Sequence, residues 1–242
     1  MIVILCHPFD EAALWLCHQF RLLGLDVEPV AVEALVYSRK IVHRLGDLGD
    51  TGEIHLSDGR VLRPESIRGL INRVCFLPLA HIERATPGDR TYASEELNAF
   101  LLAWLDSVAG PVINPAQPLS LDGGAFPSPT LFHLAAVAGL PTEGWRSDAR
   151  PGDPALAVPR ATQDVVVFDS RTFGPLIPRG LQAGCRQLAL LLGVPLLQIT
   201  FRHSDDRGWL FHAAHGLADF RVGGRPLAAA IATTFRRRAA AA

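Results

Sequence analysis

Two apolar stretches near the end of the chain decide the fold: Val194-Pro-Leu-Leu-Gln-Ile-Thr-Phe201 and Gly208-Trp-Leu-Phe-His-Ala-Ala214. Both are rich in the aliphatic, β-branched and aromatic residues that strands favour. The polar segment 202–207 lies between them and suits a connection between neighbouring strands. The sequence therefore predicts a pair of adjacent strands here.

The beginning of the chain has the pattern of a parallel α/β sheet. Residues 2–6 form a short apolar run that is typical of a buried strand. Asp10 is placed to cap a helix over residues 11–23, which Gly24 ends. A second strand is predicted over residues 27–32, and this strand–helix–strand order indicates a parallel sheet.

The segments between these two regions alternate between strand and helix signals. Asp58-Gly59 interrupts a run of alternating polar and apolar residues, which is a strong hairpin signal. Residues 141–162 contain four prolines and two glycines without periodicity and are predicted to form a linker or long loop. The other predicted elements are a short helix over 64–68, strands over 69–76, 111–115 and 164–170, and helices over 91–104, 128–139, 178–192 and 226–238.

Composition limits the class of protein. The 242 residues are 49% hydrophobic, which is enough for a substantial core. Lys and Arg number 23 against 24 Asp and Glu, so charge gives no case for a nucleic-acid partner. No apolar run is long enough to cross a membrane, and Met1–Leu5 lacks the basic region of a signal peptide. Four cysteines without Cys-x-x-Cys spacing predict reduced thiols in a cytoplasmic protein and no structural zinc.

The order of the segments resembles the ATP-grasp superfamily, in the branch of RimK-like and peptide-maturation ligases. Residues 54–73, with their Asp-Gly hairpin and an arginine on the next strand, resemble the end of that family's N-terminal domain. The helix that carries Glu95-Glu96, followed by Val112-Ile-Asn-Pro115, matches the family's "E…(V/I)NP" passage. Residues 128–142 and 165–201 are similar to the beginning and the later strands of its ATP-binding region.

This resemblance implies an α/β fold with two domains. The first, over residues 1–110, would be a Rossmann-like pre-ATP-grasp domain. The second, over residues 111–242, would be a reduced ATP-grasp α+β region without most of the central ATP-binding subdomain, because Thr142 to Asp164 is far too short to form it.

The chain departs from the family at the positions that carry its chemistry. ATP-grasp ligases bind magnesium through an acid on one strand and an acid-x-Asn on the next, and these positions read Thr200, His212 and Ala214. A hydroxyl, an imidazole and a methyl group are poor ligands for magnesium. The family also places two lysines against ATP, whereas Lys40 is the only lysine of this chain. These departures predict no catalytic, ATP-binding or metal-binding residues and no cofactor.

The favoured interpretation is a non-catalytic ATP-grasp homologue with a binding or scaffold role. Its partners would be an active ATP-grasp enzyme or its peptide substrate, and loss of the lid would expose apolar surface that a homo-oligomer or heteromer covers. An alternative is an ATP-dependent carboxylate–amine (peptide) ligase with an atypical site, which would use Mg-ATP. A second alternative is a sensor that binds a small ligand in the N-terminal cleft.

Five residues are candidates for that ligand cleft. Cys6, His7 and Asp10 follow the first predicted strand, where open α/β sheets place ligands, and Arg73 and Asn114 lie on or at the ends of later strands. A Cys6–His7 nucleophile would need both side chains on one face. Adjacent strand residues point to opposite faces, so a buried thiol and a loop histidine are favoured.

Two further questions concern charged side chains. Arg73 can pair with a carboxylate or phosphate of a ligand, or with Glu95 or Glu96 inside the protein. His212 and His215 would suit a transition metal with help from nearby residues, but we favour His212 at a strand end and His215 in the following loop. The nearby residues are His203, Asp205, Asp206 and Asp219.

Overall fold

The computed structural model describes residues 1–44, 51–117, 120–124, 126–143 and 161–239. The chain divides into two compact units, the first made of Met1–Gly123 with Ala228–Ala242 and the second of Gly124–Leu227. The predicted division into an α/β domain over 1–110 and a shortened ATP-grasp-like region over 111–242 stays a prediction. The predicted α/β class is confirmed, because the units contain parallel and antiparallel sheets together with helices.

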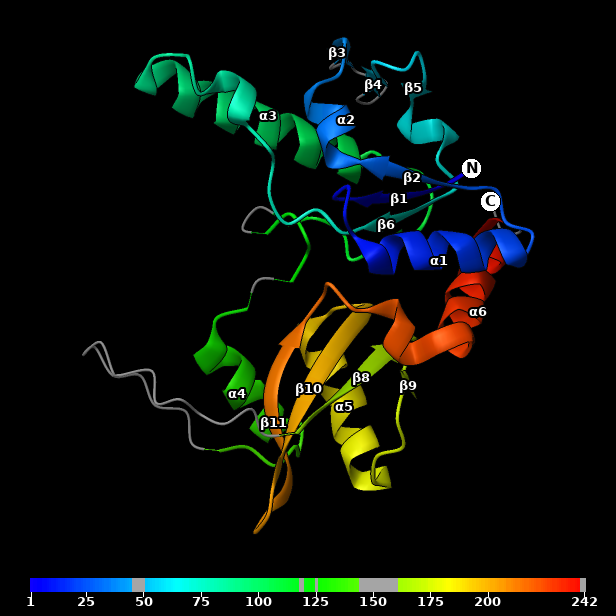
Figure 1. Ribbon diagram of the computed structural model, residues 1–242, viewed down its shortest axis with the longest axis vertical. Helices are drawn as coiled ribbons and strands as arrows, with labels where there is room; N and C mark the ends of the chain where they lie inside the picture. The colour runs from blue at the N-terminus through cyan, green and yellow to red at the C-terminus, as the bar shows by residue number, and fades with distance from the viewer. Residues whose placement is uncertain (45–50, 118–119, 125, 144–160, 240–242) are drawn as a thin grey trace. The chain divides into compact units, whose positions relative to one another are not determined.

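The first unit is built on a parallel sheet of order β2-β1-β6-β7. All five residues of β1 are buried, as expected for a strand covered on both faces. Figure 1 shows α1 along one face of this sheet and α2 and α3 on the other. The elements are β1 (Ile2–Cys6), α1 (Glu11–Leu22), β2 (Val27–Ala31), α2 (Val32–Val36), β3 (Lys40–Arg44), β4 (Thr51–His55), β5 (Val61–Leu62), η1 (Pro64–Ser66), β6 (Gly69–Asn72), η2 (Ala80–Ile82), α3 (Pro87–Asp106) and β7 (Val112–Ile113).

Local signals explain how α1 and the hairpin form. The Asp10 side chain accepts a hydrogen bond from the Ala13 N–H at 3.0 Å and so caps α1, as predicted. Gly24 follows α1 with φ of 72°, a left-handed conformation that glycine adopts without strain. Gly59, with φ of 92°, turns the chain between β4 and β5, which confirms the predicted hairpin.

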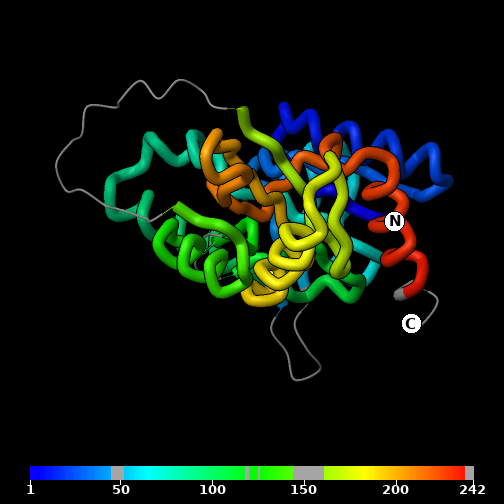
Figure 2. The backbone as a smooth tube through the Cα atoms, turned by 90° about the horizontal axis from the view of Figure 1, so that it is seen from below, coloured from blue at the N-terminus to red at the C-terminus, as the bar shows by residue number. Residues whose placement is uncertain are grey.

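The second unit is an antiparallel sheet of order β11-β10-β8-β9. Its core lies between one face of the sheet and helices α4 and α5, which Figure 2 shows side by side. The buried side chains of that face include Val167, Ile199 and Phe211. The elements are α4 (Ser128–Val137), β8 (Thr162–Phe168), β9 (Arg171–Phe173), α5 (Arg179–Leu192), β10 (Leu196–Ser204) and β11 (Gly208–His215). Helix α6 (Phe220–Ala239) kinks at Gly224, and it begins in the second unit and passes into the first at Ala228.

Several predicted boundaries were wrong. Strand β10 continues to Ser204 instead of ending at Phe201, and β6 ends at Asn72 instead of residue 76. Helix α3 begins four residues before Thr91, because Thr86 caps it through the Asp89 N–H and Pro87 takes the first turn. The strand predicted to end at Ser170 ends at Phe168. Asp169 and Ser170 have φ of 48° and 56°, and they turn the chain into β9, which the sequence analysis missed.

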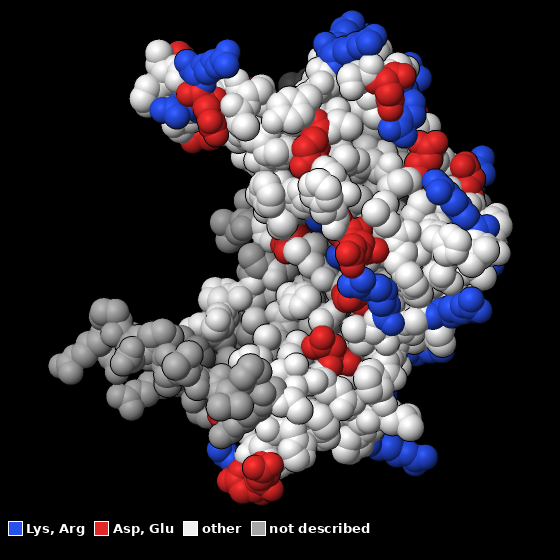
Figure 3. Space-filling view, viewed as in Figure 1, with Lys and Arg blue, Asp and Glu red and all other residues white. Residues whose placement is uncertain are grey.

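The surface and the helices agree with two expectations from composition. On the face drawn in Figure 3, basic and acidic side chains of the described residues are interspersed. None of the helices in the described ranges has the length and apolar character needed to span a bilayer. Most of the predicted linker lies in residues 144–160, outside the described residues.

Candidate functional site

The sheet order of the first unit creates a place where a ligand is expected. The chain passes from β1 to β2 on one side and later adds β6 on the other, so the order reverses between β1 and β6. Open α/β sheets bind ligands beyond the carboxyl ends of their strands at such a point. We call the residues that directly follow β1, β2, β6 and β7 the carboxyl edge. All five candidate cleft residues lie at or directly beside this edge, since Cys6 ends β1, His7 and Asp10 follow it, Arg73 follows β6 and Asn114 follows β7.

Arg73 and Asp10 form a buried ion pair at the carboxyl edge. Arg73 Nε donates to Asp10 Oδ2 at 2.6 Å and Nη2 donates to Oδ1 at 3.1 Å. The side chains are only 7% and 14% exposed. The expected pairing with Glu95 or Glu96 is wrong, because both glutamates are exposed on α3 while Asp10 presents its two oxygens to the guanidinium. This two-point contact fixes the chain after β1 to the chain after β6.

A buried amide organises the chain after β6. Asn72 Nδ2 donates to the carbonyl oxygens of Asn114, at 3.2 Å, and Leu121, at 2.5 Å, and Asn72 Oδ1 accepts from the Val74 N–H at 3.2 Å. Asn114 itself adopts the left-handed region with φ of 55°. Asn72 was missed in the sequence because nothing local distinguishes it from other residues at the end of a buried strand. Its hydrogen bonds hold the segment that carries Arg73.

His7 meets a different cysteine from the one considered in the sequence. Cys75 Sγ lies 3.5 Å from His7 Nε2, whereas Cys6 is buried within the sheet. The His7 ring stacks on Phe76 with centroids 4.3 Å apart, and Nδ1 lies 3.8 Å from Glu33 Oε1. Burial, followed by the Asp10 carboxylate, raises the pKa of the Cys6 thiol to about 12. The favoured view of Cys6 as a structural thiol therefore agrees with its surroundings.

The second unit contains the positions at which the family resemblance implies metal ligands, Thr200, His212 and Ala214. Thr200 pairs across the sheet with Ala213, and Gln198 pairs with His215, so these four residues share one face. Thr200 Oγ1 donates to Asp164 Oδ1 at 2.7 Å. We call this face, opposite α4 and α5, the Thr200 face. Ala214 belongs to the core on the other side of the sheet, so it does not share this face with Thr200.

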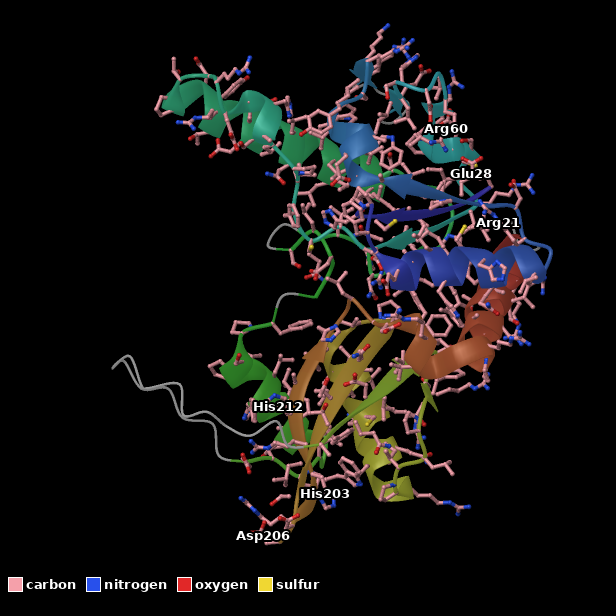
Figure 4. The ribbon with its side chains drawn as sticks, viewed as in Figure 1. Arg21, Glu28, Arg60, His203, Asp206 and His212 are labelled. Atoms are coloured by element: carbon pink, nitrogen blue, oxygen red, sulfur yellow. The ribbon has the colours of Figure 1, made fainter. Side chains whose placement is uncertain are left out.

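The histidines of β11 do not gather metal ligands. A register shift between Thr200 and Phe201 leaves His212 exposed midway along β11 (Figure 4). His215 is the last residue of β11, not part of the following loop as expected. His203 packs edge-on against Trp209, with centroids 4.9 Å apart, near the hairpin end. In the part of the chain that the structure describes, no group of three or more His, Cys, Asp or Glu residues could hold a metal ion.

The donors of the Thr200 face do not fit Mg-ATP. Magnesium prefers several carboxylate and water oxygens, whereas the carboxylate that pairs with Thr200 on this face, Asp164, already accepts the Thr200 hydroxyl. Ala213 contributes only a methyl group. These residues are therefore not expected to hold a magnesium ion for a reaction.

Comparison with solved structures identifies the fold. The macrocyclase MdnC of Microcystis aeruginosa MRC, solved with its precursor peptide MdnA, aligns with a TM-score of 0.75 and 13% identity over 98% of this chain and 100% of that chain. MdnB of the same organism gives 0.70 and 14% over 97% and 99%. The ATP-grasp ligase PsnB, solved with a minimal precursor, Mg and ADP, gives 0.69 and 15% over 97% of both chains. No protein-family model and no curated protein matches the chain.

The chain thus has the fold of ATP-grasp ligases, and it is similar to those that act with precursor peptides. The resemblance predicted from the sequence is confirmed at the level of the fold. The narrower description of the first unit as a Rossmann-like pre-ATP-grasp domain stays a prediction.

Proposed function

We propose that this protein binds a peptide of the kind that ATP-grasp peptide ligases modify. The observation that carries the proposal is the extent of the structural likeness. It covers 98% of this chain and the whole of a macrocyclase that was solved with its precursor peptide. Peptide binding is the property that a ligase and a non-catalytic homologue of this fold would share.

Exposed aromatic side chains beside the carboxyl edge support peptide binding. Phe9, in the segment after β1, is 93% exposed, and Phe76, in the segment after β6, is 56% exposed. Tyr37, directly after α2, is 44% exposed. Aromatic residues are enriched at protein interfaces because each supplies a large contact area. An apolar residue of a peptide would bury them.

The comparisons favour a second candidate, an ATP-dependent carboxylate–amine ligase, over a scaffold without ligase activity. The neighbours in structure are themselves ligases. Two observations weigh against a ligase. The Asp164 carboxylate of the Thr200 face already accepts the Thr200 hydroxyl, and the only lysine in the sequence, Lys40, lies in β3. A ligase would therefore need a metal ligand or a lysine from a partner. Release of phosphate from Mg-ATP in the presence of a carboxylate and an amine tests this candidate.

Two other expectations stay predictions. A sensor role would require a ligand to compete with Asp10 for Arg73, since the two side chains already form a two-point ion pair. Stabilisation of the protein against heat by a metabolite, without ATP, would support it. Self-association is favoured by Leu176 and Leu190 of the second unit, which are 96% and 73% exposed. Light scattering over a dilution series measures it.

Peptide binding is tested with a library of random peptides displayed on phage, followed by calorimetry with the enriched peptides. We expect a peptide with Kd below about 100 μM and weaker binding by Phe9→Ser. The matched control is Leu176→Ser, because Leu176 is as exposed as Phe9 but lies in the second unit. A library that yields no binder below that Kd would overturn the proposal.

A further inference from the structure

Three neighbouring strands of the first unit each bring one chemically active side chain to the carboxyl edge. In sheet order β2, β1 and β6, these residues are Glu33, His7 and Cys75. The sulfur of Cys75 lies 3.5 Å from Nε2 of His7, and Oε1 of Glu33 lies 3.8 Å from Nδ1. The imidazole thus has the carboxylate beside one nitrogen and the thiol beside the other.

The imidazole is held in one orientation by contacts on three sides. Its face stacks on Phe76, with an angle of 22° between the rings, while Glu33 and Cys75 face its two nitrogens. A proton on Nδ1, toward Glu33, leaves Nε2 free to accept the thiol proton. The second carboxylate oxygen of Glu33 is buried without a hydrogen-bond partner among the described residues, so this carboxylate is not engaged by a structural network.

Cys75 differs from the other three cysteines in its access to solvent. Cys6, Cys17 and Cys185 are buried, whereas Cys75 is exposed. Partial desolvation raises the pKa of the Cys75 thiol, the Asp122 carboxylate adds to the rise, and the backbone N–H groups of Cys75 and Phe76 and the Arg73 guanidinium oppose it. At neutral pH the residue is therefore a thiol, which needs a base in order to act as a nucleophile.

We propose that Cys75 is a nucleophile for activated acyl groups, with His7 as its general base and Glu33 as the residue that positions His7. The acyl donor would be a carboxylic ester or thioester with a good leaving group. The sulfur of Cys75 forms a bond to the acyl carbon, and the bond from that carbon to the leaving group breaks. The thiol proton passes to Nε2 of His7 and then to the leaving group, so no oxidant or reductant is needed. This activity is independent of the proposed binding of a peptide.

The test uses p-nitrophenyl acetate as the acyl donor and the full-length protein. We expect a burst of p-nitrophenolate of one equivalent and an acetyl group on the Cys75 peptide in mass spectra. Cys75→Ser abolishes the burst. His7→Gln slows it on the order of 10²-fold at pH 7, the lower range for general-base catalysis, and much less at pH 10, where hydroxide can take the thiol proton.

Matched variants separate chemistry from folding. His81→Gln is the control, since His81 is an exposed histidine of the same unit whose ring contacts Tyr37. Glu33→Gln should lower the rate at pH 7 and leave both the rate at pH 10 and the melting temperature unchanged, which a merely structural role would not produce. The proposal is overturned if His7→Gln acetylates as fast as the wild type at pH 7. It is equally overturned if the wild-type rate follows thiol ionisation alone between pH 6 and pH 10, a result that does not depend on any variant folding.

Discussion

The carboxyl edge of the first unit and the Thr200 face of the second unit differ in the polar side chains that they present. At the carboxyl edge, charged side chains are paired, as in the two-point contact between Arg73 and Asp10. On the Thr200 face, Thr200 contributes a hydroxyl and the opposite residue, Ala213, only a methyl group. The strands and their register nevertheless form a sheet of the same fold.

This difference teaches that the packing of the second sheet does not depend on the Thr200 face. Apolar packing holds the second sheet against α4 and α5 through residues such as Val167, Ile199 and Phe211. Those residues lie on the face opposite Thr200 and need no metal. Function must therefore be argued from the side chains of each region and not from the fold.

The largest effect is expected at the carboxyl edge. Asp10→Asn keeps a side chain that can cap α1 but removes the charge that neutralises buried Arg73. We expect a loss of about 1.5–3 kcal/mol in the free energy of unfolding, the usual contribution of hydrogen bonds to a charged group. Urea denaturation measures the loss, and the double variant Asp10→Asn/Arg73→Met should recover part of it.

An exposed ion pair of the same unit provides the comparison for Asp10→Asn. Arg60 Nη1 lies 2.6 Å from Glu28 Oε2, and both side chains are about 40% exposed, at 41% and 38% (Figure 4). Glu28→Gln should cost less than about 1 kcal/mol, because water screens exposed pairs. If Asp10→Asn costs no more than Glu28→Gln, the contact between Asp10 and Arg73 does not stabilise the carboxyl edge more than an exposed ion pair would.

The next effect compares the two units through one buried thiol in each. Burial is the main cause that raises the pKa of Cys6, in β1, and of Cys185, in α5, to about 12. In the unfolded chain a thiol ionises near pH ~8.5. The folded state therefore favours the protonated thiols, and their contribution to stability is complete below about pH 8.5 and is lost as the pH rises toward 12.

Urea denaturation at pH 8, 9 and 10 checks this pH dependence. Between pH 9 and 10, each thiol should lower the free energy of unfolding by up to about 1.4 kcal/mol. Cys6→Ala and Cys185→Ala should each make the free energy of unfolding fall less steeply with pH, by the contribution of one thiol. This holds however much each variant lowers the free energy of unfolding at pH 8. A slope that neither variant changes would mean that other groups cause the alkaline loss.

The smallest effect is expected on the Thr200 face. Thr200→Val removes the hydroxyl that donates to Asp164 and should lower the free energy of unfolding by about 1 kcal/mol, the usual contribution of such a hydrogen bond. Thr162→Val, at an exposed position of β8, is the control. If magnesium raises the melting temperature of the wild type but not of Thr200→Val, Thr200 is a metal ligand and our account of this face is wrong.

Local signals allowed much of the fold to be predicted. Asp10 capped α1 and Gly24 ended it, because both act through hydrogen bonds and φ angles within a few residues. The short strand β3 was missed, since Lys40 to Arg44 is polar at both ends and is defined by its pairing with β4. The register shift in β10 and β11 was also missed. As a result, Ala213 and His215 lie on the same face as Thr200, and Ala214 does not. No type of residue in the sequence predicts such a shift.

The candidate site was predicted in outline but not in its contacts. The rule for open α/β sheets brought Cys6, His7, Asp10, Arg73 and Asn114 to one edge. It did not predict that His7 meets Cys75. These two residues follow different strands, so their contact depends on the sheet order and on the chain between Asn72 and Cys75.

The measurement that tests the central claim most directly is a calorimetric titration of the purified protein with Mg-ATP, beside a titration with magnesium alone. The claim is that the Thr200 face has the sheet of an ATP-grasp ligase without its metal donors. It predicts no heat beyond dilution at nucleotide concentrations up to about 1 mM. A saturable one-site binding curve for Mg-ATP would contradict the claim and make the ATP-dependent ligase the leading function.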